Sequence, residues 1–375
     1  MDISRYRHEF DVVENFTFFN HASVAAPPRR ARRALTEWAD EIGSHGVEAE
    51  QSWMEVDASA RERTARLLGV SAKEIALVEN TSTGLSLVAA GLSWKPGDQV
   101  ATCRAEEYPS NVFPWLHLAD HGVEVREIAP IDGGVTVDAV ERVLTERTRL
   151  VSVSAVQFAS GHRTPLAKVG ELCASHDVLL CVDGIQQLGA FDIRPKECGV
   201  HFITADSHKW MLGFPGIGVL YVDEALCAQM RPALVGWKSV RDPFTFDSAN
   251  FILREDAARF EAGSLAWGLI AGMDKSLELI EEIGIERIST RIRSLLERAA
   301  SGLARLGCKV GPAPADRAGI LTFAPPAGEL ESLFDSLKRA GFSLSMRRGR
   351  LRISPHFYNT DEEIDRLLAT VAESI

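Results

Sequence analysis

Short apolar runs alternate with segments of helical periodicity through the first two-thirds of the chain. In the segments between these runs, apolar residues recur every three or four positions, as in helices that cover a sheet. The runs predict strands at residues 75–79, 99–103, 123–128, 150–156, 178–182 and 217–222. Alternation of this kind predicts an α/β fold, in which a mostly parallel mixed sheet is flanked by helices on both faces.

Four polar or aromatic side chains follow closely on predicted strands. They are Thr81, Tyr108, Gln157 and Asp183. Ligands of such sheets bind at the carboxyl ends of the strands. We therefore expect these four side chains to lie near one another, at the edge of the sheet where a binding site would form.

The last third of the chain has a different pattern and predicts a small α+β domain. Helices are predicted at residues 286–306 and 329–340, and short strands at 320–323, 343–346 and 351–354. A final helix starts at Thr360, whose capping-box partner is Glu363. We therefore expect an N-terminal arm of residues 1–30, a large domain of residues 31–269 and a small C-terminal domain of residues 270–375.

Composition and charge exclude several classes of function. The net charge of −11 disfavours a general affinity for nucleic acid or anionic membranes. The six cysteines form no C-x-x-C pair and the ten histidines show no ligand spacing, so we expect neither a disulfide framework nor a metal site. The N-terminus lacks an apolar signal core, and no apolar run is long enough to span a membrane, which predicts a cytoplasmic protein.

Lys209, in the segment Ser207-His208-Lys209-Trp210, is the main candidate for a catalytic residue. It lies between two apolar runs, where loss of water lowers the pKa of an amine. An uncharged amine is what a lysine needs to form a Schiff base with an aldehyde. The alternative is an ordinary solvated lysine, which is the more common case.

Asp183 ends the apolar run at residues 178–182 and is the candidate partner of a cofactor ring. A carboxylate there would keep a pyridine nitrogen protonated, so that the ring can accept electrons. Gln186, one helical turn later, would then reach the phenolic oxygen of the ring, and Tyr108 would stack on the ring face. The alternatives are a capping role for Asp183 and core packing for Tyr108.

The segment from Asn80 to Gly84 predicts a phosphate site, because a strand leads there into a hydroxyl-rich turn that opens a helix. Free N–H groups and the helix dipole attract anions at such a terminus. Capping of the helix by Thr81 or Ser82 explains the same residues and, taken alone, is favoured. The glycines at residues 213–218 precede a strand and not a helix, so they do not form a dinucleotide-binding loop.

Arg352 lies on a predicted strand of the small domain. A fixed guanidinium can bind a substrate carboxylate through two parallel hydrogen bonds, or it can simply pair with an acidic side chain. Both interpretations stay open. The basic segment Arg347-Arg348-Gly349-Arg350 either favours a second acidic group on the substrate or is a solvated turn.

Together these motifs resemble the class V aminotransferase family, whose members are fold-type I enzymes that use pyridoxal 5′-phosphate (PLP). The group includes cysteine desulfurases, isopenicillin N epimerase-like proteins and kynureninase. The resemblance covers nearly the whole chain. The matching segments occur in family order at residues 20–22, 80–84, 111–115, 183–186, 207–210, 259–264, 352–354 and 358–360.

The resemblance implies a role for each matched residue. It implies that Lys209 carries PLP as a Schiff base, that Asp183 pairs with the ring nitrogen and that Gln186 lies near the phenolic oxygen. The phosphate ligands that it implies are Thr81, Ser82, His208 and, across the interface of a homodimer, Ser264. The substrate-binding residues that we expect are Asn20, His21, Gln157 and Arg352, with Arg352 binding the carboxylate.

Three departures from the family pattern bear on the reaction. Tyr108 stands where desulfurases carry a histidine over the ring. Asp206 replaces a phosphate-binding serine of many relatives, so we leave it out of the phosphate ligands. Desulfurases also need a mobile nucleophilic cysteine late in the chain, and the one cysteine after Cys227 is Cys308, which matches neither desulfurase loop.

The resemblance therefore implies a PLP-dependent enzyme that acts at Cα of an amino acid or related amine. Aminotransfer is our first choice, because every matched residue serves it and no further group is required. A C–S or other β-lyase and an epimerase use the same residues and stay open as alternatives. A cysteine desulfurase or a non-catalytic partner protein with this fold ranks below them.

Overall fold

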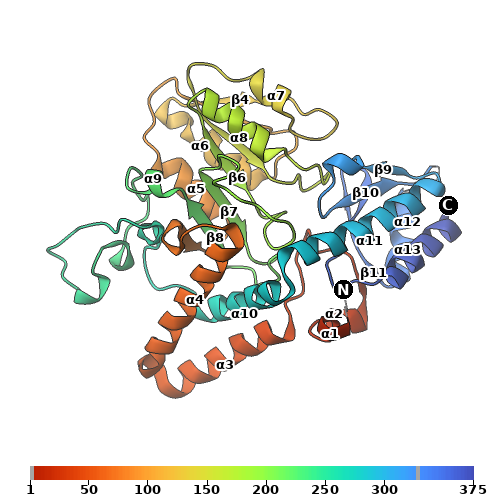
Figure 1. Ribbon diagram of the computed structural model, residues 1–375, viewed down its shortest axis with the longest axis horizontal. Helices are drawn as coiled ribbons and strands as arrows, with labels where there is room; N and C mark the ends of the chain where they lie inside the picture. Colours follow the sequence, from red (N-terminus) through yellow and green to blue (C-terminus); the bar gives the residue numbers. More distant parts are fainter. Residues whose placement is uncertain (1–3, 327–329) are drawn as a thin grey trace.

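A seven-stranded sheet forms the centre of the larger part of the molecule (Figure 1). The computed structural model describes residues 4–326 and 330–375. The strands are β2 (Ile75–Val78), β3 (Gln99–Thr102), β4 (Glu124–Glu127), β5 (Thr148–Ser154), β6 (Leu179–Asp183), β7 (Phe202–Asp206) and β8 (Gly218–Val222), in the order β2-β8-β7-β6-β5-β3-β4. Strands β3 to β7 run parallel to their neighbours, whereas β8 is antiparallel to both β7 and β2. The predicted mostly parallel mixed sheet is confirmed.

Strand β7 is the element of this sheet that the apolar pattern does not predict. Thr204 and Asp206 interrupt its apolar residues, so the sequence shows no continuous run there. The strand is nevertheless buried along its whole length. It matters for the site, because Lys209 follows three residues after its end.

Helices cover both faces of the sheet, because neighbouring strand residues point to opposite sides. Leu180 and Val182 belong to one hydrophobic core, while Cys181 between them belongs to the other. The second core also holds the apolar side of α5 (Thr81–Gly91). The two cores bury both faces of the sheet, so a binding site can form only at the ends of the strands.

Three long helices, α3 (Arg29–His45), α4 (Glu50–Leu68) and α10 (Trp267–Ile283), pack against one another below the sheet (Figure 1). Helix α4 is terminated by Gly69, whose left-handed φ of 70° favours glycine, because glycine has no Cβ. The expected domain boundary at residue 270 falls within α10. The division into three parts stays a proposal.

A four-stranded antiparallel sheet, ordered β12-β13-β10-β9, forms the smaller part of the molecule. Its strands are β9 (Lys309–Gly311), β10 (Leu321–Ala324), β12 (Ser345–Arg347) and β13 (Arg350–Ile353). The helices α11 (Ile285–Arg305), α12 (Leu330–Arg339) and α13 (Asp361–Ser374) pack beside it (Figure 1). Residue 329, with which the predicted helix at 329–340 begins, lies outside the described residues. The predicted capping box of Thr360 and Glu363 is present at the start of α13.

The N-terminal arm joins the smaller part of the molecule. It contains the short helices α1 (Ser4–Arg7) and α2 (Val12–Asn15), and its strand β1 (Thr17–Phe18) pairs in parallel with β11 (Phe342–Ser343). Asn20 continues this contact by bridging to Ser354. No helix within residues 4–326 or 330–375 is long and apolar enough to cross a lipid bilayer.

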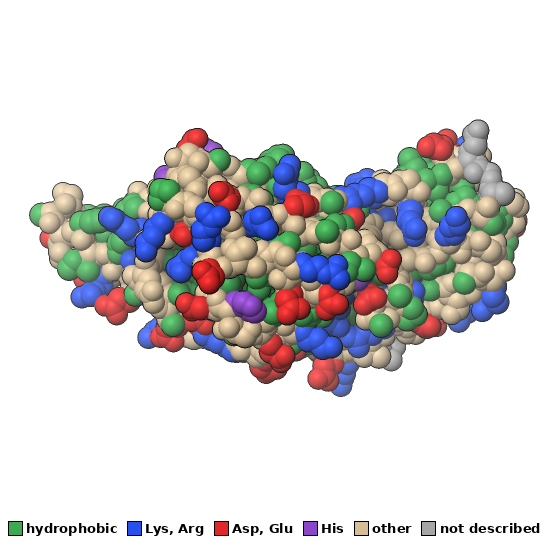
Figure 2. Space-filling view, turned by 90° about the horizontal axis from the view of Figure 1, so that it is seen from above, with side chains coloured by type: hydrophobic (Ala, Val, Ile, Leu, Met, Phe, Trp, Pro, Cys, Tyr) green, Lys and Arg blue, Asp and Glu red, His purple; other side chains and the backbone are tan. Residues whose placement is uncertain are grey.

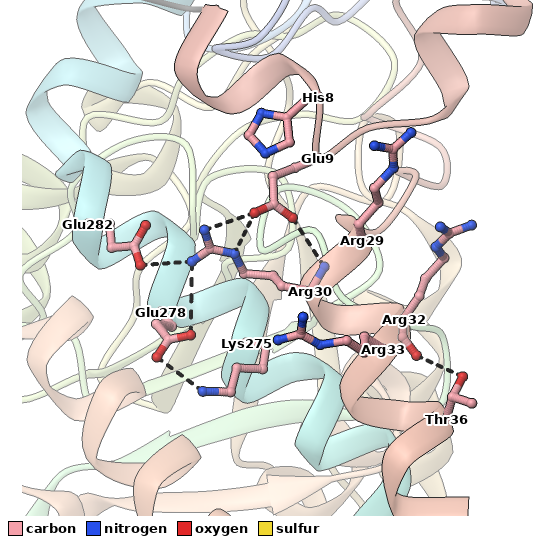
Figure 3. Close-up of a pocket in the computed structure, with 10 residues that line it drawn as sticks. All are labelled: His8, Glu9, Arg29, Arg30, Arg32, Arg33, Thr36, Lys275, Glu278 and Glu282. Carbon is pink, nitrogen blue, oxygen red and sulfur yellow. Dashed lines mark hydrogen bonds and ion pairs between the residues drawn. The ribbon is translucent and has the colours of Figure 1, made fainter.

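A charged cleft of about 870 Å³ lies where the arm meets α3 and α10 (Figure 3). Several of its charges are paired with one another. Arg30 donates from Nε to Glu9 Oε1 at 2.9 Å and from Nη1 to Glu282 Oε1 at 2.8 Å. Lys275 lies 3.1 Å from Glu278. The cleft therefore holds an ion-pair network that fastens the arm to the two helices.

Replacing Arg30 should destabilise the protein. Arg30→Ala leaves the mostly buried Glu9 carboxylate without its partner, and we expect the free energy of unfolding to fall by about 1–3 kcal/mol. Arg33→Ala is the matched control: its pair with Glu37 is 76% and 66% exposed, and the loss should be below about 0.5 kcal/mol. Urea unfolding followed by circular dichroism measures both; equal losses would contradict the proposed role of Arg30.

Candidate active site

A pocket of about 350 Å³ opens at the carboxyl ends of β5, β6 and β7. It collects side chains from the arm, the start of α5, three loops of the larger part and two strands of the smaller part. Eight of the residues expected from the sequence line it: Thr81, Ser82, Tyr108, Asp183, Gln186, His208, Lys209 and Arg352. The structure thus brings together residues that are spread over most of the chain.

Lys209 and Asp183 face the same pocket. Burial lowers the pKa of Lys209 to about 8, although the nearby Asp183 acts in the opposite direction. Burial likewise raises the pKa of Asp183 to about 7, against a hydrogen bond that its Oδ1 accepts from the N–H of Ile185 at 3.0 Å. The Lys209 amine lies 5.9 Å from the centre of the Tyr108 ring. The pocket therefore holds an amine that loses its proton far more easily than a solvated lysine does.

The helix α5 begins at the pocket and is capped by Asn80, not by Thr81 or Ser82. The side-chain oxygen of Asn80 accepts from the N–H of Thr83 at 2.9 Å. Thr81 Oγ1 instead accepts from the N–H of Asp206 at 2.9 Å, and Ser82 Oγ lies 2.7 Å from Ser110 Oγ. The capping explanation for Thr81 and Ser82 is thus wrong, and both hydroxyls lie at a helix N-terminus suited to an anion.

Asp206 lines the pocket but faces a basic side chain. Its Oδ1 lies 2.7 Å from Nδ1 of His208, and the backbone N–H of His208 donates to the same oxygen at 3.3 Å. A carboxylate next to a bound phosphate is unfavourable unless a cation accompanies it. The imidazole of His208 supplies that cation when it is protonated.

The Gln186 amide connects two neighbouring segments. Its Nε2 donates to the carbonyl of Ala22 at 3.0 Å, and its Oε1 accepts from Nε1 of Trp210 at 2.9 Å. Gln186 therefore joins the arm to the loop that carries Lys209. Its expected contact with a ring oxygen stays a prediction.

Arg352 is buried and held in one position. Its guanidinium donates to Ser345 Oγ at 3.0 Å, to Ser23 Oγ at 2.7 Å and to the carbonyl of Phe158. In residues 4–326 and 330–375, no carboxylate lies within 4.0 Å of it. The alternative that Arg352 pairs with an acidic side chain thus fails within these residues. Burial, together with Arg347, lowers its pKa to about 10.

Four residues expected at the site do not line the pocket. Both ring nitrogens of the buried His21 are bonded, to the Ser354 carbonyl at 2.8 Å and to the Tyr358 hydroxyl at 2.7 Å, and burial lowers its pKa to about 4. Asn20 accepts from Ser23 Oγ at 2.8 Å and so holds the serine that binds Arg352. His21 and Asn20 therefore hold residues next to the pocket in position and do not line the pocket themselves.

Gln157 and Ser264 complete this set. The buried Gln157 donates from Nε2 to Glu107 Oε1 at 2.8 Å. Ser264 is exposed in the segment that precedes α10, outside the pocket. Its expected contact would be made to a second copy of the chain, so this contact stays a prediction.

Glu107 is a residue beside the site that the sequence analysis missed. Its buried carboxylate accepts from the N–H and the hydroxyl of Ser154, from Gln157 and from Nδ2 of Asn111 at 2.9 Å. Ser154 pairs in register with Asp183, so Glu107 fastens the Tyr108 loop beside that acid. Nothing in the sequence separates Glu107 from the adjacent Glu106, which instead pairs with Arg348.

None of the residues that line the pocket is a cysteine. All six cysteines are free thiols, and five of them are buried. Burial raises the pKa of Cys103 to about 12 and that of Cys227 to about 11. Such thiols belong to the hydrophobic cores and are poor nucleophiles.

These features define a class of enzyme before any comparison is made. A lysine of lowered pKa near an acid, next to a helix N-terminus that carries two hydroxyl groups, suits a cofactor with an aldehyde, a basic ring nitrogen and a phosphate. The comparisons agree. The chain belongs to the aminotransferase class-V family, whose model matches residues 18–367. The PLP-dependent fold type I predicted from the sequence is thereby confirmed.

Individual relatives carry names from two kinds of chemistry. A "probable cysteine desulfurase" of Methanothermobacter thermautotrophicus is 28% identical, over 98% of this chain and 96% of that protein. The "uncharacterized aminotransferase YcbU" of Bacillus subtilis is 26% identical, over 98% and 97%.

Solved structures share the whole fold. An apo structure of a cysteine desulfurase from Thermococcus onnurineus NA1 has a TM-score of 0.89 at 25% identity, covering 99% of this chain and 97% of that one. The cystine C–S lyase C-DES, in complex with cysteine persulfide, has a TM-score of 0.90 at 25% identity, covering 97% and 99%.

The pKa of Lys209 predicts how its reactivity depends on pH. Since burial lowers this pKa to about 8, about half of the amine is uncharged at pH 8, whereas ordinary lysines titrate near 10.4. In the cofactor-free protein, acetylation of Lys209 by limiting acetic anhydride should therefore rise with pH, with the midpoint of the rise near pH 8. Mass spectrometry of its peptide measures this, and the peptides of surface lysines are the comparison. A Lys209 profile that follows theirs would show that the pocket does not desolvate the amine.

Proposed function

We propose that this enzyme acts at Cα of an α-amino acid and transfers its amino group. The observation that carries the proposal is Arg352, a fixed and buried guanidinium that lines the same pocket as Lys209. A buried cation is costly unless an anion accompanies it. The carboxylate of an amino acid supplies that anion.

In this proposal each residue of the pocket has a separate role. Bound PLP supplies a ring that withdraws electrons from Cα. Lys209 would attach the cofactor and would move the proton at Cα of the substrate. Asp183 would keep the ring nitrogen protonated, and Tyr108 would pack on the ring. Thr81, Ser82 and His208 would bind the phosphate.

Amino-group transfer is preferred because the pocket contains everything that it requires. Transfer of sulfur through an enzyme-bound persulfide requires a thiolate near the substrate. No cysteine is among the lining residues, so the desulfurase names of several relatives are not carried over to this chain. A C–S lyase is the second candidate, because the cystine C–S lyase C-DES shares the fold at a TM-score of 0.90.

The proposal includes a homodimer in which Ser264 reaches the phosphate of the neighbouring site. The segment before Ser264 is anchored by Glu261, which accepts from Arg61 at 2.7 Å and from the N–H of Leu77 at 2.9 Å. The nearby loop at residues 231–256 extends from the body of the molecule (Figures 1 and 2). Its Phe246 and Phe251 are 76% and 66% exposed. Exposed aromatic side chains of this kind favour contact with another protein surface.

Two substitutions and a substrate panel test the proposal. Lys209→Ala should remove the visible absorbance of the lysine-bound cofactor, because the amine that attaches it is gone. Arg352→Ala should raise KM for amino acids at least about tenfold, because it removes a charge-assisted pair. Assays for keto acid, ammonia and sulfide on a panel of amino acids separate transfer from elimination.

The outcomes are distinct. Keto acid that appears only with an amino acceptor present supports transfer, whereas ammonia or sulfide without an acceptor supports the C–S lyase. An unchanged visible band in Lys209→Ala would show that another residue carries the cofactor. A holoenzyme whose absorbance responds to no amino acid would contradict the proposed function itself.

A further inference from the structure

We propose that Arg347 binds a second acidic group, so that the substrate is an α-amino acid with a carboxylate or sulfinate on its side chain. The inference rests on the proposed function and narrows it to one class of substrate. It depends on two arginines that line one pocket from neighbouring strands, β12 and β13. We assign Arg352 to the α-carboxylate of the substrate, which leaves Arg347 available for a second anionic group.

Arg352 is the committed arginine. Ser23, Ser345 and the carbonyl of Phe158 each accept one of its hydrogen bonds, which fixes the guanidinium on three sides. A guanidinium carries five N–H donors, so at least one remains for a ligand. One carboxylate of the substrate would occupy the remaining N–H donors of Arg352.

Arg347 lies beside it because of the register of the two strands. Ser345 is paired with Arg352, and Arg347 follows two residues later on the same face of β12. Its side chain is exposed at the pocket, and Nη1 donates to the carbonyl of Met346 at 2.8 Å. No carboxylate in the described parts of the chain lies within 4.0 Å of its guanidinium.

The turn that carries Arg347 is fastened to two residues of the larger part of the molecule. Arg348 Nη1 lies 2.8 Å from Glu106 Oε2, and its guanidinium carbon lies 5.7 Å from the centre of the Phe158 ring, which lines the pocket. Arg348 adopts a left-handed φ of 48° in this turn. Ion pair and ring together hold the turn, so Arg347 stays at the pocket although its own side chain is exposed.

The charges of the pocket leave Arg347 without a partner. Two acidic residues line the pocket: Asp183, which serves the ring nitrogen, and Asp206, which faces His208. The α-carboxylate of the substrate is matched by Arg352. An anionic side chain on the substrate is the group that would match Arg347.

The test measures substrate preference in the holoenzyme. The change in cofactor absorbance gives an apparent Kd for three acidic amino acids, aspartate, glutamate and cysteine sulfinate, and for the neutral asparagine, glutamine and alanine. Arg347→Ala should weaken binding of the best acidic substrate about tenfold or more, because it removes a charge-assisted bond, and should change the neutral ones less than about twofold. Comparing carboxylates with the sulfinate identifies the side-chain acid.

Arg350→Ala is the matched control. Arg350 begins β13, directly opposite Arg347, and is likewise exposed, but its guanidinium is beside Gly311 of β9 and does not line the pocket. The Arg350→Ala variant should leave all affinities unchanged. An equal loss of affinity in both variants would indicate a general effect of charge.

Three results would overturn the inference. They are a wild-type enzyme without preference for acidic side chains, a loss in Arg347→Ala that is equal for acidic and neutral substrates, and no loss at all. The second would mean that Arg347 shares the α-carboxylate with Arg352, and the third that the turn is merely solvated. If neutral amino acids change the absorbance normally, the proposed function stands even when this inference fails.

Discussion

Loss of water around the Lys209 amine is the physical constraint on which the pocket depends. The lysine follows β7, a fully buried strand, and its side chain enters a pocket that also holds Asp183. Burial penalises both charges, so it lowers the pKa of the amine to about 8 and raises that of the acid to about 7. The opposite charge of each group offsets only part of the cost of burying the charge of the other. A lysine whose pKa lies near neutral pH suits the proton transfer at Cα that we propose for Lys209.

The N-terminal arm makes this arrangement possible, because it connects the small sheet to the lysine loop. The N–H of Ala22 donates to Ser354 Oγ at 2.9 Å, and the N–H of Ala25 donates to the carbonyl of His208 at 2.7 Å. The same short segment thus touches the strand region of Arg352 and the residue before Lys209. Arg352 comes from the smaller part of the molecule and Lys209 from the larger part, and the arm contacts the segments that carry both. This explains why a polar motif around His21 can matter for the site without lining it.

The sequence predicts most of the sheet, because buried strands leave apolar runs that local pattern detects. It misses β7, where Thr204 and Asp206 interrupt the run and burial on both faces comes from the tertiary fold. The sequence also predicts that the residues after the strand ends lie near one another, because the topology of a parallel sheet brings the carboxyl ends of its strands to one edge. It cannot find Glu107, because the partners of that carboxylate are as far as 50 residues away in the chain and the adjacent Glu106 looks the same. The role of Ser264 depends on a second copy, which one chain does not contain.

The reaction of such a pocket depends less on the shared lysine and acid than on what surrounds the substrate. This family supports sulfur chemistry and amino transfer on one scaffold, as the names of its members indicate, and the scaffold by itself does not choose between them. In this chain the lining residues contain no thiol, and the cysteines serve as core residues whose thiols are hard to ionise. In place of a thiol, the lining residues include two guanidinium groups, Arg347 and Arg352. We infer that such a pocket selects its substrate by charge, while the lysine and the bound cofactor supply the bond chemistry.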